Sequence, residues 1–344
     1  MNHKTFMRFI ALTTLIFFLQ IGHISIAQDD DFSIFDIESE VTMTITSDIS
    51  ALVLNKFIDN DYTTALINFE INGENIPFKG KINTRGNFRR DTSNCDFPPL
   101  KLKFKKEDIK NALLHGNTSI KIVTHCKSNV PEFKQFLMRE YLTYKIYNEL
   151  TTYSLQVKLV DIIYKDIKGI EEPIKQTAFL IEDIDHLAKR NGMKEYEEDI
   201  SYNDLNSENA IQLSVFQFMI GNSDWIVQMG KNLKFISDGN NIIAIPYDFD
   251  YTALVNTDYS LGGESTFLST PERLFKGDCF TVKDLEKNIL LFNDKKKNIM
   301  KLISGSKDLS YESKQYMKMY LNEFYRIVNS ESKLATTLLE NCEN

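Results

Sequence analysis

The sequence of 344 residues is poor in the side chains that build metal clusters and hydrolase sites. It has five histidines and four cysteines, and no C-x-x-C pair. Paired-cysteine zinc modules are therefore not predicted, although His115 and His125, near Cys126, leave a mixed zinc site as an alternative. The absence of a G-x-S-x-G segment argues against a hydrolase with a nucleophile elbow. A metal-dependent phosphoesterase would activate water with acids and metal ions, and the lack of a histidine-rich ligand set argues against it.

Long apolar runs are also absent after the first 27 residues. In that first segment Lys4 and Arg8 precede an apolar run (residues 9–19), and small residues lead up to Ala27. This pattern is typical of a signal peptide, so the chain is predicted to be exported, periplasmic or secreted, with cleavage near Ala27. No later segment is apolar enough to span a membrane.

Basic charge is not in excess, since 40 Lys and Arg face 48 Asp and Glu. Loss of the signal peptide would leave 38 basic residues and a net charge of −10, which disfavours nonspecific nucleic-acid binding. A local basic patch in residues 79–106 faces either phosphates or only solvent. Its members are Lys79, Lys81, Arg85, Arg89, Arg90, Lys101, Lys103, Lys105 and Lys106.

The four cysteines form an even set, which export would place in an oxidising compartment. Cys95 and Cys126 flank the predicted strands at residues 100–104 and 120–124, so a disulfide between them is the preferred pairing. Cys279 and Cys342 would then pair and tie down the C-terminal helices.

Hydrophobic periodicity divides the chain into two parts. An antiparallel sheet is predicted from period-two strands at residues 40–46, 66–71, 76–82, 100–104 and 120–124. From residue 132 the period becomes helical, and it returns to strands at 157–164 and 176–182. Further helices are predicted at 209–219, 281–303 and 311–339, the second with a Thr281-x-x-Asp284 capping box. The polar residues 189–208 predict a surface loop or lid.

The clearest chemical signal lies between Gly221 and Asp250. Asp224 follows the helix at 209–219, Asn232 comes eight residues later, and Asp248 and Asp250 close a predicted hairpin. Hard cations such as Mg²⁺ prefer carboxylate and amide oxygens, and phosphoryl transfer needs such cations beside the phosphates. Because aspartate also favours caps and turns, a purely structural role is the alternative for these residues.

These segments resemble the spore-coat protein H (CotH) kinase family and, more distantly, the HipA toxin kinases, both atypical relatives of the protein-kinase fold. In those families a G-N-x-D segment precedes an Asn and a strand that ends in a P-[YW]-D-x-D-like motif. Three more segments are similar to the coat-protein family: the run from Arg85 to Arg90 with the basic strand after it, residues 137–141, and residues 178–185. The resemblance covers roughly residues 80–251.

The resemblance implies an α+β, atypical kinase-like fold of two lobes. Residues 28–130 would form a sheet-rich N-terminal lobe, and residues 131–344 a larger helical C-terminal lobe. It also implies ATP and Mg²⁺ as cofactors. Asp224 would be the catalytic aspartate, and Asn232, Asp248 and Asp250 would be metal ligands.

The same resemblance implies cofactor-binding roles in the first half of the chain. Pro98-Pro99 stands where the family has two lysines, so Lys101 or Lys103 would supply the phosphate contact, together with Arg85. Glu182 would lie in the hinge-like strand between the lobes.

The function implied is that of an exported atypical kinase that binds ATP and Mg²⁺ and phosphorylates an envelope or secreted protein. No maintained ATP pool exists outside the inner membrane, and this favours an alternative. In that alternative a catalytically silent protein of the same fold serves as an envelope or surface binding protein, with the carboxylates holding structural Mg²⁺ or Ca²⁺.

Overall fold

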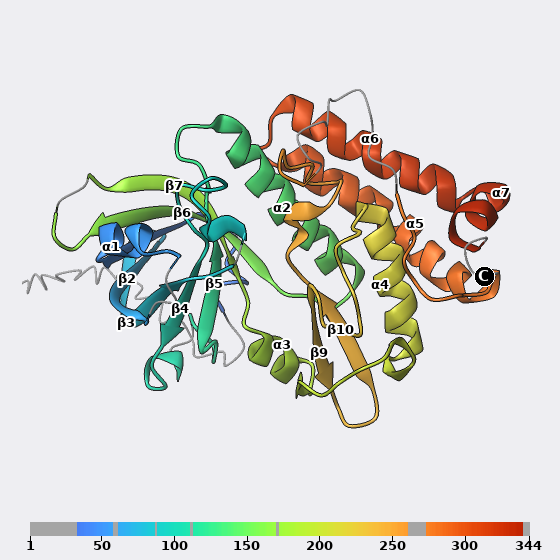
Figure 1. The fold of residues 1–344 in the computed structure, drawn as a ribbon, viewed down its shortest axis with the longest axis horizontal. Coiled ribbons are helices and arrows are strands. Elements are labelled where there is room, and N and C mark those ends of the chain that lie inside the picture. The colour runs from blue at the N-terminus through green and yellow to red at the C-terminus, as the bar shows by residue number, and fades with distance from the viewer. Residues whose placement is uncertain are drawn as a thin grey trace, which may run out of the picture.

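A computed structural model describes residues 33–57, 61–86, 88–110, 113–169, 172–260 and 273–339. The predicted signal peptide and Cys342 lie outside these residues. The chain is mixed α+β, with a barrel on one side and most of the helices on the other, as Figure 1 shows. Among the helices described, none has both the length and the apolar composition to cross a membrane. The predicted α+β class and the helical C-terminal region are confirmed.

The main sheet is a closed barrel of seven strands in the order β1-β2-β3-β4-β5-β7-β6. Every neighbouring pair is antiparallel except β1 and β6, whose parallel pairing closes the barrel. The strands are β1 (Val41–Ser47), β2 (Thr63–Ile71), β3 (Glu74–Thr84), β4 (Leu100–Phe104), β5 (Ser119–Val123), β6 (Val157–Asp166) and β7 (Ile174–Ile181).

The closed barrel corrects the prediction of a simple antiparallel N-terminal sheet. The sequence predicts each strand, but the β1–β6 pairing joins segments more than a hundred residues apart, and no local signal specifies it. Strands β6 and β7 follow the first long helix and still complete the barrel. Closure leaves no free sheet edge, which removes a common site of aggregation.

Alternating side chains fill the barrel interior. The strand β1 buries every second residue, including Val41, Met43 and Ile45. Gly80 on β3 allows the close approach of β4, because a Cβ atom there would lie 2.8 Å from the carbonyl oxygen of Lys103. Burial of each large apolar side chain stabilises the fold by about 1.5–3 kcal/mol.

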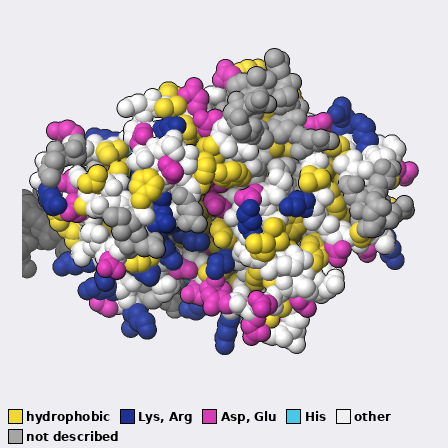
Figure 2. Space-filling view, viewed as in Figure 1, with side chains coloured by type: hydrophobic (Ala, Val, Ile, Leu, Met, Phe, Trp, Pro, Cys, Tyr) yellow, Lys and Arg dark blue, Asp and Glu magenta, His cyan; other side chains and the backbone are white. Residues whose placement is uncertain are grey.

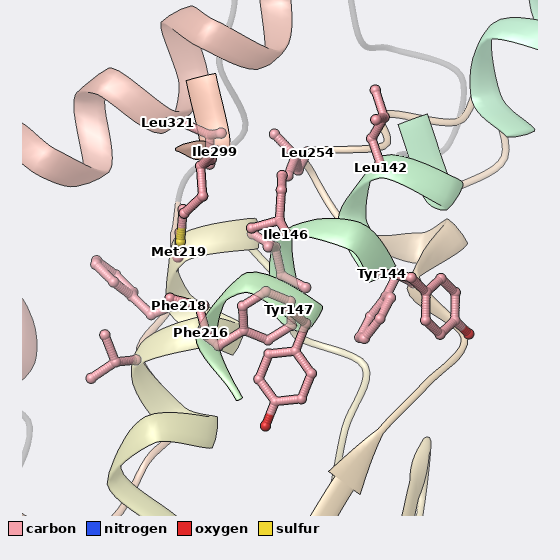
Figure 3. Packing of buried hydrophobic residues seen from close by; sticks show 14 of the residues in the cluster. Leu142, Tyr144, Ile146, Tyr147, Phe216, Phe218, Met219, Leu254, Ile299 and Leu321 are labelled. Carbon is pink, nitrogen blue, oxygen red and sulfur yellow. The ribbon is translucent and has the colours of Figure 1, made fainter. Parts of the chain in front are cut away.

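The helical part is built around α2, which lies between the barrel and the C-terminal helices (Figure 1). Figure 3 shows Tyr144, Ile146 and Tyr147 of α2 near Phe216 and Met219 of α4, in one continuous apolar cluster. The helices are α1 (Ile49–Leu54), α2 (Pro131–Leu150), α3 (Ile184–Arg190), α4 (Ser207–Ile220), α5 (Val282–Gly305), α6 (Tyr311–Val328) and α7 (Glu331–Leu334).

A second sheet, in the order β10-β9-β8, lies below α2 in Figure 1, beside α3 and α4. It consists of β8 (Lys194–Tyr196), β9 (Leu233–Ser237) and β10 (Ile242–Pro246). The predicted β9–β10 hairpin is present. The polar segment 189–208 is not simply a loop, because β8 adds a third strand to this hairpin through its pairing with β9.

The C-terminal helices agree with the sequence at their start and differ at their end. The capping box of Thr281 and Asp284 begins α5 as predicted. The helix predicted at residues 311–339 instead stops at Val328, where the Asn329 side chain accepts from and donates to Asn293 of α5. A polar contact between helices therefore accompanies a break that the helical period did not indicate.

The structure contains the preferred disulfide, Cys95–Cys126, which joins the loop after β3 to the loop after β5. The bridge is buried against Phe133 at the start of α2. It therefore fastens the long β3–β4 connection to the barrel and to the helical part. The alternative zinc site loses Cys126, because a disulfide sulfur is not a thiolate ligand.

Replacing both Cys95 and Cys126 by alanine should lower the free energy of unfolding by about 2–4 kcal/mol, because the bridge closes a loop of sequence separation 31. Urea denaturation would measure this loss. The exposed Lys297 on α5 provides the control, since Lys297→Ala should change stability by less than about 0.5 kcal/mol. Equal stability of the double variant and the parent would refute the expectation.

Candidate functional site

The β9–β10 hairpin brings the two ends of the carboxylate-bearing run together. Its ladder ends at the pair Leu233 and Pro246, and just beyond it the N–H of Tyr247 donates to the carbonyl of Asn232 at 3.1 Å. Asn232 and Asp248 therefore lie on neighbouring steps across the ribbon. The order of residues in the sequence predicted this meeting.

A glycine turn sets the position of Asp224. The helix α4 ends at Gly221, which is left-handed with φ 64°. A Cβ atom there would lie 2.0 Å from the hydroxyl oxygen of Tyr320, so only glycine fits. The next residue, Asn222, is buried, and its side-chain oxygen accepts the N–H of Asp224 at 2.8 Å. These contacts direct the chain from a buried helix to the surface at Asp224.

Asp224 is linked directly to the other side of the hairpin. The amide nitrogen of Asn232 donates to the Asp224 carbonyl at 2.7 Å and to its carboxylate at 2.9 Å. The second carboxylate oxygen pairs with the ammonium group of Lys231. With its side chain 32% exposed, Asp224 can be reached by a molecule from solution.

Asp248 follows β10 and is half-buried, with a left-handed backbone at φ 63° and ψ 65°. Among the residues described, none donates a hydrogen bond to its carboxylate. Burial and the neighbouring charge of Asp250 raise the pKa of Asp248, while the cations Arg85, Arg89 and Lys121 oppose that shift. A partly desolvated carboxylate without a direct partner is suited to receive a cation.

Asp250, in contrast, is bound by the protein itself. One of its carboxylate oxygens lies 2.8 Å from the Nη2 atom of Arg89 and accepts the hydroxyl of Tyr259 at 3.0 Å. The same Nη2 atom contacts Glu140 of α2 at 3.0 Å. This buried cluster ties the loop after β3 to α2 and to the segment after β10, so the carboxylate of Asp250 is already committed.

The negative charge of Glu140 is the least favourable of the cluster. Burial raises its pKa to about 7, with further contributions from Asp250 and Asp248, and Arg89 only partly offsets them. Its second oxygen has no hydrogen-bond partner among the described residues. Two buried carboxylates therefore share one guanidinium in this cluster.

A basic wall of the barrel lines a cavity of about 540 Å³, whose other side is formed by α3, β8 and β9. Lys101 of β4 and Lys121 of β5 are direct partners in the ladder, so their side chains leave the same face. Figure 2 shows basic side chains over the barrel and acidic ones below the middle of the molecule, where α3 lies in Figure 1. The charged lining residues are Lys101, Lys103, Lys106, Lys121, Lys234, Asp183, Asp185, Glu195 and Glu197.

Lys121 is the most perturbed cation of this wall. Burial and the like charges of Arg85, Lys101 and Lys234 lower its pKa to about 8, against the attraction of Asp248. Among the described residues no carboxylate forms an ion pair with Lys121. An anion bound between these like charges would relieve their repulsion, in competition with the acids on the other side of the cavity.

The other two predicted phosphate contacts have different surroundings. Arg85 is half-buried after β3, and its Nε atom is buried without a hydrogen-bond partner in the described chain. Lys103 lies over the ring of Tyr62, 4.2 Å from the ring centre, on the outer part of the wall. Arg85 is thus the closer of the two to Asp248, whose pKa its charge lowers.

Glu182 has a structural role in the connection from β7 to α3. Its buried carboxylate contacts the Nδ1 atom of His186 at 2.6 Å and accepts from Arg190 at 2.8 Å. It also accepts the N–H of Gln156 at 2.8 Å. Burial raises the pKa of Glu182, but these hydrogen bonds outweigh that effect and leave the pKa lowered. Its oxygens are therefore used to hold the connection.

Sequence reasoning missed three residues of the site, namely Lys121, Arg89 as an anchor, and Glu140. Arg89 was visible as part of a basic patch, but its acidic partners are 51 and 161 residues away in the chain. Lys121 sits in a short strand whose pattern indicates only a β-structure. Pairing between distant strands is what places these groups beside Asp248.

No preformed acidic metal centre is present in the described ranges: no group of three or more His, Cys, Asp or Glu side chains is arranged to hold an ion. His125 packs instead against the rings of Phe97 and Tyr164, and His115 against the ring of His186. The oxygens without a hydrogen-bond donor among the described residues include those of Asp248, the side-chain oxygen of Asn232 and the second carboxylate oxygen of Asp250. Mg²⁺ often binds in this way, with one or two protein ligands completed by phosphate oxygens and water.

Comparison with known proteins adds no family assignment. No protein-family model matches the chain, and no curated protein sequence matches it.

The raised pKa of Glu140 predicts a pH effect on stability. Because its pKa is higher in the folded protein than in the unfolded chain, this group stabilises the fold below about pH 4.5, and the contribution is lost as the pH rises through about 7. The unfolding free energy of Glu140→Gln should therefore rise relative to the parent over this interval, by on the order of 2 kcal/mol.

Urea denaturation at several pH values would test this prediction. Glu132→Gln, at an exposed position in the first turn of the same helix, is the matched control and should follow the parent at each pH. A constant difference between Glu140→Gln and the parent from pH 4.5 to 7 would show that Glu140 does not titrate in this way.

Proposed function

We propose that this protein binds Mg²⁺ and ATP between the barrel and the helical part, and transfers the terminal phosphoryl group to a hydroxyl of an exported protein. The proposal includes the atypical kinase-like arrangement that the sequence resemblance implies, with the barrel in the N-terminal lobe. The observation that carries it is the carboxylate of Asp248, which has no ion pair among the described residues and is attracted by the charges of Lys121 and Arg85, two cations that also lack one there.

The charge distribution supports a ligand with several phosphates. Lys121, Lys101 and Arg85 lie on the barrel side without acidic partners that would neutralise Lys121. Asp248 and Asn232 present oxygens at the end of the β9–β10 hairpin. Phosphates would be neutralised by the cations of the barrel, and Asp248 and Asn232 would hold a metal ion that supplies further positive charge.

The protein groups fit a magnesium ion only when a phosphate ligand is also bound. Asp248 and Asn232 would hold the ion, which neutralises phosphate charge and supplies electrophilic assistance to the transfer. Two protein oxygens are too few for tight binding of the metal alone. Cation and nucleotide are thus expected to bind together.

Asp224 is suited to orient and deprotonate the acceptor hydroxyl. It is exposed on the same ribbon end as Asp248, and Asn232 holds its carboxylate at 2.9 Å. The ammonium group of Lys231, paired with the other oxygen, is placed to move toward a phosphoryl group as charge builds on it. In this mechanism the fixed amide of Asn232 keeps the carboxylate in position while Lys231 is drawn away.

The same contacts favour a second candidate, a silent binding protein of this fold. Both carboxylate oxygens of Asp224 are engaged, and the exported location predicted by the sequence has no maintained ATP pool. In this case the basic wall binds an anionic partner or glycan and no phosphoryl transfer occurs.

Binding and transfer are separable by mutation. Asp248→Asn should weaken Mg²⁺-dependent ATP binding about tenfold or more, because it removes the charged metal ligand, and Lys121→Met should weaken ATP binding to a similar extent. Asp224→Asn should retain binding and lower transfer by about a hundredfold. Calorimetry would measure affinity, and labelled ATP would measure transfer.

Exposed residues elsewhere supply matched controls, Asp294→Asn on α5 and Lys79→Met on β3, and both should behave as the parent. Binding of ATP and Mg²⁺ without transfer to any hydroxyl substrate would favour the silent protein. Failure of the parent to bind ATP in the presence of Mg²⁺ would reject the nucleotide assignment for both candidates.

A further inference from the structure

Asp248 has an unfavourable backbone conformation, and a side chain of α2 accepts its N–H. We propose that Tyr144 is the positioning residue for Asp248, because its phenol oxygen accepts the Asp248 N–H and so holds the left-handed turn that sets the direction of the carboxylate. The inference rests on the proposed function, which makes Asp248 a metal ligand. The contact between Tyr144 and Asp248 can be tested without any ligand.

The geometry of the contact is well defined. The N–H of Asp248 donates to the Tyr144 oxygen at 2.8 Å. Asp248 has φ 63° and ψ 65°, a left-handed conformation that residues with a Cβ atom disfavour. The hydrogen bond from the Asp248 N–H to Tyr144 offsets the cost of this conformation, because a buried donor without a partner is unfavourable.

Tyr144 is rigid enough to fix this turn. It is almost fully buried, and its ring lies 4.5 Å from that of Phe249 and 5.8 Å from that of Phe179, measured between ring centres. Phe249 follows Asp248 directly, while Phe179 belongs to β7 of the barrel. The ring of Tyr144 thus packs between the Asp248 turn and the barrel, which carries the cations proposed to bind phosphate.

Glu140, one helical turn before Tyr144, reaches the same segment through Arg89 and Asp250. The spacing of four residues places both side chains on one face of α2. Glu140 therefore fixes the far end of the turn at Asp250, and Tyr144 fixes its beginning at Asp248. Without the phenol oxygen the beginning is free to relax toward an extended conformation, which changes the direction of the Asp248 carboxylate.

Tyr147 provides a control of the same chemistry. It lies on the same helix and is equally buried, yet its hydroxyl has no hydrogen-bond partner among the described residues. Tyr144→Phe removes an oxygen that accepts a backbone N–H, whereas Tyr147→Phe removes one that binds nothing. A general effect of losing a buried hydroxyl would therefore appear in both variants.

The first measurement uses the ligand-free protein with its disulfide intact. Backbone amide hydrogen exchange, followed by NMR, should be at least about tenfold faster at Asp248 in Tyr144→Phe than in the parent, and unchanged in Tyr147→Phe. Equal protection of Asp248 in Tyr144→Phe and the parent would overturn the inference.

The second measurement tests the consequence for the site. Tyr144→Phe should weaken ATP binding in Mg²⁺ about tenfold, while ATP binding in EDTA, which relies on the basic wall, should stay the same. A purely structural role for Tyr144 would weaken both, and that result would count against the inference, as would unchanged binding in Mg²⁺.

The two measurements separate the inference from the proposed function. If the parent binds no ATP, the proposed function fails, and the exchange rate at Asp248 still decides whether Tyr144 holds the turn. If Tyr144→Phe does not fold, substitution of Tyr144 by 3,5-difluorotyrosine keeps the ring and weakens the oxygen as an acceptor. Faster exchange at Asp248 in that protein would support the inference, and unchanged exchange would overturn it.

Discussion

The buried guanidinium of Arg89 is the contact on which the arrangement of the site depends. A buried charge is stable only when it is paired, and Arg89 finds its partners on two separate elements, Asp250 after β10 and Glu140 on α2. The loop that carries Arg89 is fastened further by the Cys95–Cys126 disulfide. Loop, helix and hairpin are thus held in one relative position.

Some charged groups of the site have hydrogen-bond or ion-pair partners, and others have none among the described residues. Asp250 and Glu182 bind cations and hydrogen-bond donors, Asp250 through one carboxylate oxygen and Glu182 through both, so they serve the architecture. Among the described residues no cation or donor binds the Asp248 carboxylate and no carboxylate pairs with Lys121, which lies over the ring of Tyr247. Both groups have shifted pKa values, as expected of groups in a ligand site. The distinction follows from partners rather than from residue type, because aspartate appears in both sets.

Particular residues show which features of the site could be predicted from the sequence. Asp224, Asn232 and Asp248 were predicted to meet because a short hairpin joins them, and a hairpin is a local structure with a local signal. The disulfide was predicted because its cysteines flank neighbouring strands. Glu182 was expected near a cofactor, yet His186 and Arg190 surround it, and a contact of that kind depends on how the following helix packs. Lys121 and Tyr144 looked like an ordinary strand residue and an ordinary helix-packing residue.

By itself the sequence determined the α+β class, nearly all the strands and helices, and the hairpin that brings the carboxylates together, since each follows from period, turn residues and caps within a short stretch of chain. Only the tertiary structure decided the closed barrel, the basic wall and the pairing of Arg89 with two distant acids. These features need contacts between residues that are tens to more than a hundred positions apart. The stability of such contacts depends on burial and on the charges nearby, which the folded chain alone creates.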